Sequence, residues 1–235
     1  TMPPRMIMAL MVAAVLPALA GGQTELLPQS QSEIRTVWNP PPASGNPAAL
    51  WTDAANWTGQ IPDGGPNADY YKVVFSISGA RECILDQTRV VRQLVQGDHG
   101  PGGILRITNG GHLTSGWYTE DGQTKRVWTG IGWCNTATLI VEQSGQLSVG
   151  DHLWIALPEG SDGTLIIDGG TVTVAHQLGL NWENQPNSSA RILLYDGQLN
   201  VENWTENTIG INSFLDIHAG SVQISGDRRY LIEPM

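Results

Sequence analysis

The sequence predicts an all-β chain that folds as a right-handed parallel β-helix, with three short strands per turn and about five to six turns. Two observations predict this solenoid. A template of alternating apolar residues around a glycine-ended corner recurs five times, at a spacing of roughly two dozen residues that is typical of solenoid repeats. Glycine is frequent, with 28 residues in 235, while charged residues make up 14%, which suits tight corners between packed strands.

The repeat supplies the three strands of each turn. The copies begin 23 to 34 residues apart, and the longest interval requires an insertion after the first copy; they start at Leu105, Leu139, Leu165, Ile192 and Leu215. The glycines between the first and second strands are Gly111, Gly145, Gly170, Gly197 and Gly220. A third apolar pair, such as Leu153 with Ile155, completes a turn, and its period of two directs these side chains to a shared interior. Parallel coiling of this kind favours the right-handed sense.

Residues 1–20 have the pattern of a signal peptide. Arg5 precedes the apolar run 6–16, and the sequence Ala-Leu-Ala at 18–20 forms a small-residue cleavage site. We therefore expect a secreted protein, extracellular or on the cell surface, with no transmembrane segment after cleavage.

The rest of the chain divides into three segments by composition. They are a polar linker at 21–35, a Trp- and Pro-rich capping segment at 36–66, and the solenoid at 67–235. The strands expected in an atypical first turn are residues 73–77, 83–85 and 91–95. Residues 230–232 fall where a third strand should begin, so we expect the solenoid to be truncated at its C-terminus.

The tryptophans of the capping segment predict how the coil is closed. We expect Trp38, Trp51 and Trp57 to fold back, either to cap the coil or to cover the outward side of the first strands. That side is apolar in the middle turns, as on a strand that is covered from outside. Its residues there are Ile140, Ile166 and Leu193.

Charge and cysteine content limit the possible partners. A formal net charge of −10, with 12 scattered Lys and Arg residues, excludes nucleic acid. Cys83 and Cys134 either pair as a disulfide or lie as two small buried residues. The sequence has no cluster of His and Cys at metal-ligand spacing, so we expect no bound metal and no cofactor. Ca²⁺ would suit the acidic charge, but no motif supports it.

Two stretches carry a resemblance to a known family. The first runs from Trp38 to Pro62 and contains LWTD at 50–53 and NWTG at 56–59, and the second reads GTLIIDGGTVTV at 163–174. Together they resemble the secreted, autotransporter-type (passenger-associated) β-helical repeat proteins of environmental, planctomycete-like bacteria. The resemblance covers most of the mature chain. It implies a β-helical protein of the cell surface and almost nothing about activity.

One candidate site follows the first strand of each turn. There Glu142, Asp168, Tyr195 and His218 are expected to stack above Thr108 on successive turns. Acids beside a Tyr and a His could serve a polysaccharide lyase or a glycoside hydrolase. However, we expect no basic residue in the neighbouring columns, and acids beside glycine are common at corners. We therefore expect this column not to be catalytic.

Tryptophan provides the second candidate site. A chain with nine Trp and two Phe is unusual, and an exposed indole offers a large stacking surface for a sugar. The residues expected in loops or outward positions are Trp117, Trp154 and Trp204. Trp154 is expected to stand alone on its face, whereas Trp133 and Trp182 are expected to point inward.

These patterns predict a non-catalytic extracellular or cell-surface solenoid with a structural or adhesive role. Glycan binding is one candidate role, and the expected partners are extracellular polysaccharides or other surface proteins. The alternative is a fragment of a carbohydrate-active enzyme, either a polysaccharide lyase or a glycoside hydrolase, built on a parallel β-helix.

Overall fold

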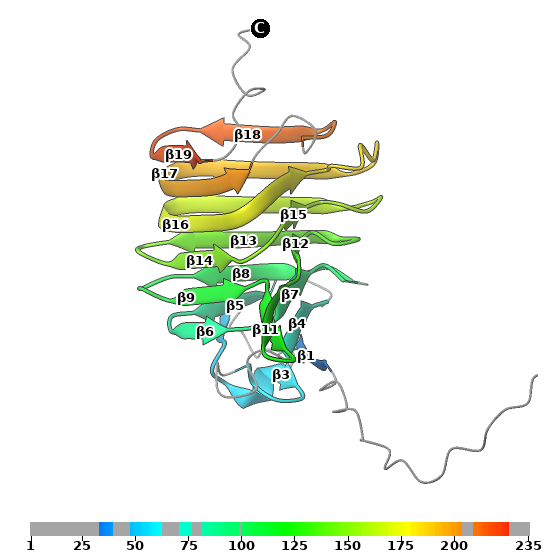
Figure 1. Ribbon diagram of the computed structural model, residues 1–235, viewed down its shortest axis with the longest axis vertical. Helices are drawn as coiled ribbons and strands as arrows, with labels where there is room; N and C mark the ends of the chain where they lie inside the picture. The colour runs from blue at the N-terminus through cyan, green and yellow to red at the C-terminus, as the bar shows by residue number, and fades with distance from the viewer. Residues whose placement is uncertain are drawn as a thin grey trace, which may run out of the picture. The chain divides into compact units, whose positions relative to one another are not determined.

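The computed structural model of the chain describes residues 33–39, 48–62, 71–76, 81–98, 100–203 and 209–225 (Figure 1). These residues all lie within one compact unit, Gln31–Met235. The expected signal peptide, Trp204 and the chain after residue 225 lie outside the described residues. Among the residues described, no helix is long and apolar enough to cross a membrane.

The described chain is all-β with almost no helix. A single 3-10 turn, η1 (Ala54–Asn56), is the one helical element in these residues. One curled sheet contains 17 of the described strands, and its pairings are parallel except that of β1 (Ile34–Trp38) with β3 (Trp57–Thr58). The predicted all-β class and the parallel pairing are therefore confirmed.

The strands of the sheet form three parallel ladders. The first ladder contains, in order, β2 (Ala48–Leu50), β5 (Glu82–Leu85), β8 (Gly103–Ile107), β13 (Thr136–Glu142), the first part of β16 (Asp162–Leu180), the first part of β17 (Ser189–Asn203) and β18 (Ser213–Ile217). The second contains β6 (Thr88–Val90), β9 (His112–Ser115), β14 (Gln146–Val149), later parts of β16 and β17, and β19 (Ser221–Ile224). The third contains β1, β4 (Tyr71–Phe75), β7 (Gln93–Gln96), β12 (Thr129–Ile131), β15 (Leu153–Ile155) and the end of β16.

Consecutive repeats of the sequence occupy consecutive levels, and most levels contribute one strand to each ladder. Figure 1 shows the levels stacked in chain order, from β5 and β6 in teal to β18 and β19 in orange. The first ladder has the register that the repeat predicts. Its inward column runs through Cys83, Leu105, Leu139, Leu165, Ile192 and Leu215. A slip of one residue would turn every apolar side chain of a strand outward, so the core specifies this pairing.

The inward side chains of the three ladders form one core. Leu105, Leu113 and Leu153, one from each ladder, are fully buried. Burial of one such side chain contributes about 1.5–3 kcal/mol. Leu215 and Ile217 hold inward positions in the last described level but are 41% and 50% exposed, because no described strand follows β18 in its ladder.

Two different constraints select glycine at the corners between the first and second ladders. At Gly145 a Cβ would collide with the carbonyl oxygen of Ile107 on the preceding level. At Gly197 the backbone is left-handed, with φ of 99°. A close approach and a positive φ therefore both occur at the position where the repeat predicts glycine.

The Trp-rich segment begins the ladders rather than covering them from outside. Its tryptophans Trp38, Trp51 and Trp57 are buried in the core. The Trp51 indole donates to the Pro62 carbonyl oxygen at 2.9 Å, and the Trp57 indole donates to the Trp51 carbonyl oxygen at 2.7 Å. Phe75 packs against all three rings, with centroids 5.9 to 6.2 Å away. Of the two predicted arrangements, the burial fits capping, at the end of the three ladders.

The outward side of the first ladder is not covered by these tryptophans. Ile140, Ile166 and Leu193 remain half-buried there, and Asp216 is exposed in the last described level. The expectation that the Trp-rich segment covers this side is wrong, because β1 and β2 extend the third and first ladders edge-on.

The insertion after the first repeat is a hairpin. Strands β10 (Trp117–Glu120) and β11 (Gln123–Arg126) pair antiparallel and form a separate two-stranded sheet. The Arg92 guanidinium lies 4.0 Å from the Tyr118 ring centroid, which ties the hairpin to the segment before β7. This hairpin accounts for the long interval between the first two copies of the repeat.

Both cysteines are free thiols. Cys83 is fully buried in the core, and burial together with the charge of Glu82 raises the pKa of its thiol well above the usual value. Cys134 is half-buried, and burial followed by the charge of Asp98 raises the pKa of its thiol. Of the two predicted alternatives, a disulfide or two unpaired small residues, the structure has the unpaired cysteines.

Candidate functional site

The column that follows the first ladder does not stack as predicted. Glu142 lies beside Asp168, but a register shift then pairs Asp168 with Asp196. Tyr195 is therefore the extra residue of an irregularity in the strand rather than the next member of the column. As predicted, it lies beside His218, with ring centroids 4.9 Å apart, and both residues are exposed. The predicted column thus separates into an acidic part and an aromatic part.

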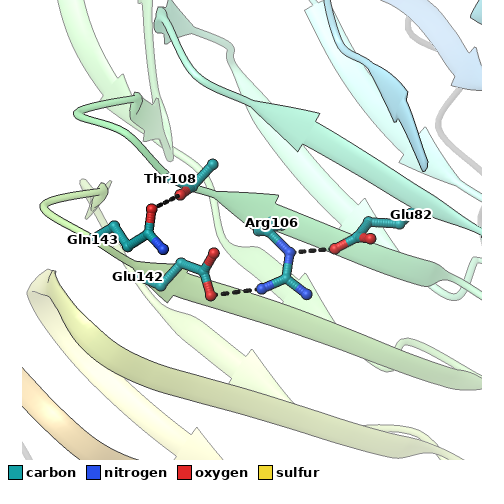
Figure 2. Close-up of polar contacts among 5 residues, drawn as sticks. All are labelled: Glu82, Arg106, Thr108, Glu142 and Gln143. Atoms are coloured by element: carbon teal, nitrogen blue, oxygen red, sulfur yellow. Dashed lines mark hydrogen bonds and ion pairs between the residues drawn. The ribbon is translucent and has the colours of Figure 1, made fainter.

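Arg106 lies between Glu82 and Glu142, acids of the two adjacent levels (Figure 2). Its Nη1 donates to Glu142 Oε2 at 2.6 Å, and its Nε donates to Glu82 Oε1. Burial lowers the pKa of the Arg106 guanidinium, but the hydrogen bonds and charges of the two acids outweigh burial and raise that pKa above its usual value. The expectation that no basic residue approaches Glu142 is wrong, because Arg106 is its diagonal neighbour across the ladder.

A hydrogen bond also links adjacent levels at the corner beside this ion pair. Thr108 Oγ1 donates to Gln143 Oε1 at 3.4 Å, next to Glu142 (Figure 2). His218 lies three levels further along the chain, where it contacts Asp216 Oδ2 at 3.1 Å. The structure therefore does not bring Glu142 and His218 together. Glu82, Arg106 and Glu142 form a row of ion pairs across the three strands β5, β8 and β13.

A second group of side chains lies on the outer side of the third ladder. We call it the aromatic strip, and it consists of Trp128 stacked on Trp133 and Trp154 stacked on Trp182. The ring centroids of the first pair are 4.1 Å apart at an interplanar angle of 19°. Those of the second pair are 5.0 Å apart at 9°. Stacking covers the facing surfaces of each pair, so only the outer faces and the edges of the indoles remain as flat apolar surfaces.

The backbone under Trp154 explains how this ring is held. Trp154 alternates with the buried Leu153 and Ile155, so its side chain points outward. Its ring lies over Gly179 of the next level, where a Cβ would collide with the indole. Trp154 is 8% exposed, whereas Trp182 is 44% exposed. Since Trp154 covers one face of Trp182, the exposed area of Trp182 lies on its remaining face and its edges.

A glycine also makes room for the first pair of the strip. Trp128 and Trp133 come from the two ends of β12 and meet outside Gly130. A Cβ at Gly130 would lie 3.0 Å from Trp128 Cζ3 and 3.3 Å from Trp133 Cε3. Both tryptophans are half-buried. Glycine in the outward column thus makes room for the rings of both pairs.

The predictions that Trp133 and Trp182 point inward and that Trp154 stands alone are wrong. Period-two alternation ends just before Trp133 and just before Trp182. The preceding residues, Gly132 and Asn181, are left-handed, with φ of 69° and 40°. The backbone reversal places both indoles outside, where Trp133 meets Trp128 and Trp182 meets Trp154.

The other predicted tryptophans do not join the strip. Trp117 begins the hairpin and is half-buried, with its indole packed against Gly150 and the Arg126 guanidinium 5.3 Å from its ring centroid. Trp204 lies outside the described residues. Of the three predicted glycan-binding residues, the structure places Trp154 in the strip.

Two histidines adjoin the strip at the corner between the second and third ladders. The His152 ring stacks on Trp154 with centroids 4.9 Å apart, and the His176 ring meets His152 edge-on at 4.5 Å. His176 Nδ1 lies 3.1 Å from His152 Nε2. Asp151 completes a group whose potential ligand atoms all lie within 4.8 Å of one another.

This corner could not be recognised from the sequence, because its members come from successive repeats. His152 and His176 are 24 residues apart, so no local motif joins them. The sequence feature that could indicate the strip is the outward column Gly130, Trp154 and Gly179. Glycine beside a large ring at the same register position indicates that the ring packs across levels. It indicates the place of the strip, although not its other members.

The chain matches no family model, no curated protein and no solved structure.

Proposed function

We propose that the protein is a non-catalytic extracellular or cell-surface β-solenoid that binds polysaccharide through the aromatic strip. The observation that carries this proposal is the pair of stacked indole pairs, with Trp182 as the most exposed ring. Indoles that are fixed by stacking lose little conformational freedom when a sugar packs on them, so their apolar area contributes to affinity at low entropic cost.

Charge favours a neutral polysaccharide as the ligand. The protein has a formal net charge of −10, which would repel a polyanionic chain at low ionic strength. The strip is apolar, and stacking on indoles needs only the C–H face of a sugar ring. Its two pairs lie on adjacent levels, since Gly130, over which the first pair meets, is the ladder partner of Trp154. A linear glycan could therefore contact both pairs.

We propose that the three ladders wind as a right-handed parallel β-helix. Their pairing in the order of the repeats supports a coil, and the strong preference of parallel crossovers for the right-handed sense supports its handedness. The resemblance to autotransporter-type β-helical repeat proteins and the signal-peptide pattern at residues 1–20 support a secreted location.

The enzyme alternative has less support. A lyase or glycosidase needs an acid and a base around one cleft, whereas Glu142 is bound by Arg106 and lies levels away from His218. A binding function requires no such constellation.

Affinity gel electrophoresis tests the proposal. The purified chain would be run in native gels that contain neutral polysaccharides, such as a β-glucan, a xyloglucan or a galactomannan, with a polyuronate as the charged comparison. Retardation by at least one neutral polymer, together with a change in Trp fluorescence on titration, is expected. Unchanged mobility and fluorescence with the whole panel would contradict the proposal.

A further inference from the structure

The corner formed by Asp151, His152 and His176 has the composition of a metal site. Asp151 and His152 lie between β14 and β15, and His176 lies in β16 at the same corner of the next level. All three side chains are partly exposed, with His176 the most accessible at 40%. Their ligand atoms lie within 4.8 Å of one another. Solvent can therefore reach the site.

Two contacts fix the orientation of the His152 ring. His152 Nδ1 lies 2.9 Å from Asp151 Oδ2, a distance that suits donation from this nitrogen to the carboxylate. Donation from Nδ1 leaves the lone pair of His152 Nε2 facing His176 Nδ1, 3.1 Å away. Carboxylates that accept from one nitrogen of a histidine commonly orient the other nitrogen toward a metal.

The spacing of the nitrogens suits a tetrahedral ion. Two imidazole nitrogens bound to Zn²⁺ at about 2.0–2.1 Å lie roughly 3.3 Å apart. The 3.1 Å between His152 Nε2 and His176 Nδ1 is close to this separation. Asp151 Oδ1, which lies 3.6 Å from His176 Nδ1, is positioned as a third donor. Water would complete the coordination.

We propose that Asp151, His152 and His176 bind a divalent transition-metal ion of the Zn²⁺ class. Imidazole and carboxylate together suit Zn²⁺, Ni²⁺ or Cu²⁺, whereas Ca²⁺ and Mg²⁺ prefer sites made of oxygen alone. The bound ion joins two successive levels of the structure. It also fixes the His152 ring, on which Trp154 stacks, so the ion stabilises the edge of the aromatic strip.

Isothermal titration calorimetry with ZnCl₂ tests this site, using the chain without a histidine tag. We expect one Zn²⁺ ion per chain, an increase in melting temperature on addition of ZnCl₂, and no comparable effect of CaCl₂. The variants His152→Ala, His176→Gln and Asp151→Asn should each weaken Zn²⁺ binding by about tenfold or more.

Matched controls come from two other histidines. His112 contacts Ser148 Oγ at 2.8 Å and His218 contacts Asp216, and within the described part of the chain neither belongs to a group of potential metal ligands. His112→Gln and His218→Gln should bind Zn²⁺ as the wild type does. The His176 side chain is partly exposed, so its variant is expected to fold. Absence of Zn²⁺ binding to the wild type, or equal binding by His176→Gln, would overturn the proposal.

Discussion

The Trp154 indole lies directly over Gly179, its partner on the next level of the third ladder. The two residues are 25 positions apart in the sequence, and neither is informative alone. Together they show how a ladder of short strands fixes a large ring on its outer surface. Glycine supplies the space, and the stacked Trp182 and His152 rings limit where the indole can move.

Gly179→Ala should therefore destabilise the protein. The added Cβ collides with a ring that His152 and Trp182 hold in place, and overpacking of this kind costs about 1–3 kcal/mol. Urea unfolding followed by circular dichroism would measure the loss, and near-UV dichroism would report displacement of the indole. In the double variant with Trp154→Leu, where the ring is absent, most of the cost of the alanine should disappear. Equal stability of Gly179→Ala and wild type would show that the ring does not lie there.

Arg106→Met should destabilise the protein by about 1–3 kcal/mol, because Glu82 and Glu142 would be left close together without their shared partner. The midpoint of urea unfolding measures this. Replacing all three residues, as Arg106→Met with Glu82→Gln and Glu142→Gln, should recover much of the loss. Arg191→Met on an exposed position is the control and should change stability by less than about 0.5 kcal/mol. If both arginine variants behaved alike, the row of ion pairs would have no stabilising role.

Trp51→Ala should cost about 3–5 kcal/mol, since it removes a fully buried ring and its hydrogen bond to Pro62. Trp182→Ala, at a ring that is 44% exposed, should cost far less. Comparison of the two unfolding midpoints separates the core tryptophans from those of the strip. A small effect of Trp51→Ala would mean that the Trp-rich segment is dispensable for the fold.

The two thiols should differ in reactivity toward a thiolate-specific reagent. Burial raises the pKa of Cys83 well above its usual value, so little thiolate forms near pH 8 and the sulfur is also inaccessible. Cys134 has a raised pKa as well, but it is half-buried. We expect Cys134 to react slowly in the native protein and Cys83 only after unfolding in urea. Mass spectrometry after alkylation with iodoacetamide would identify the modified residue, and early labelling of Cys83 would contradict the buried position.

The register of the first ladder could be predicted from the sequence because it depends on a repeated local pattern. Leu105, Leu139 and Leu165 occupy equivalent positions of the repeat, and the structure pairs them directly. The ends of the third-ladder strands could not be predicted in this way. There a single left-handed residue, Gly132 or Asn181, ends the alternation and reverses the direction of the next side chain.

The candidate sites depend on contacts between levels, which the pattern of one repeat does not contain. The long side chain of Arg106 reaches Glu142 diagonally, so the two members of this ion pair lie in different columns of the repeat. In the same way, His152 and His176 meet only because their corners stack. Among the predicted glycan-binding residues, Trp154 does lie in the strip. Its outward position could be predicted because it follows directly from the alternation of β15.

Binding of a neutral polysaccharide to variants of the aromatic strip tests the central claim most directly. Isothermal titration calorimetry would compare the wild type with Trp182→Ala and with Trp128→Ala/Trp133→Ala, using the polymer that retards the protein most, and Trp117→Phe as a control outside the strip. Far-UV dichroism would verify that each variant is folded. We predict that each strip variant weakens binding by about tenfold, equivalent to about 1.4 kcal/mol, while Trp117→Phe binds as the wild type does. Unchanged affinity in both strip variants would contradict the account.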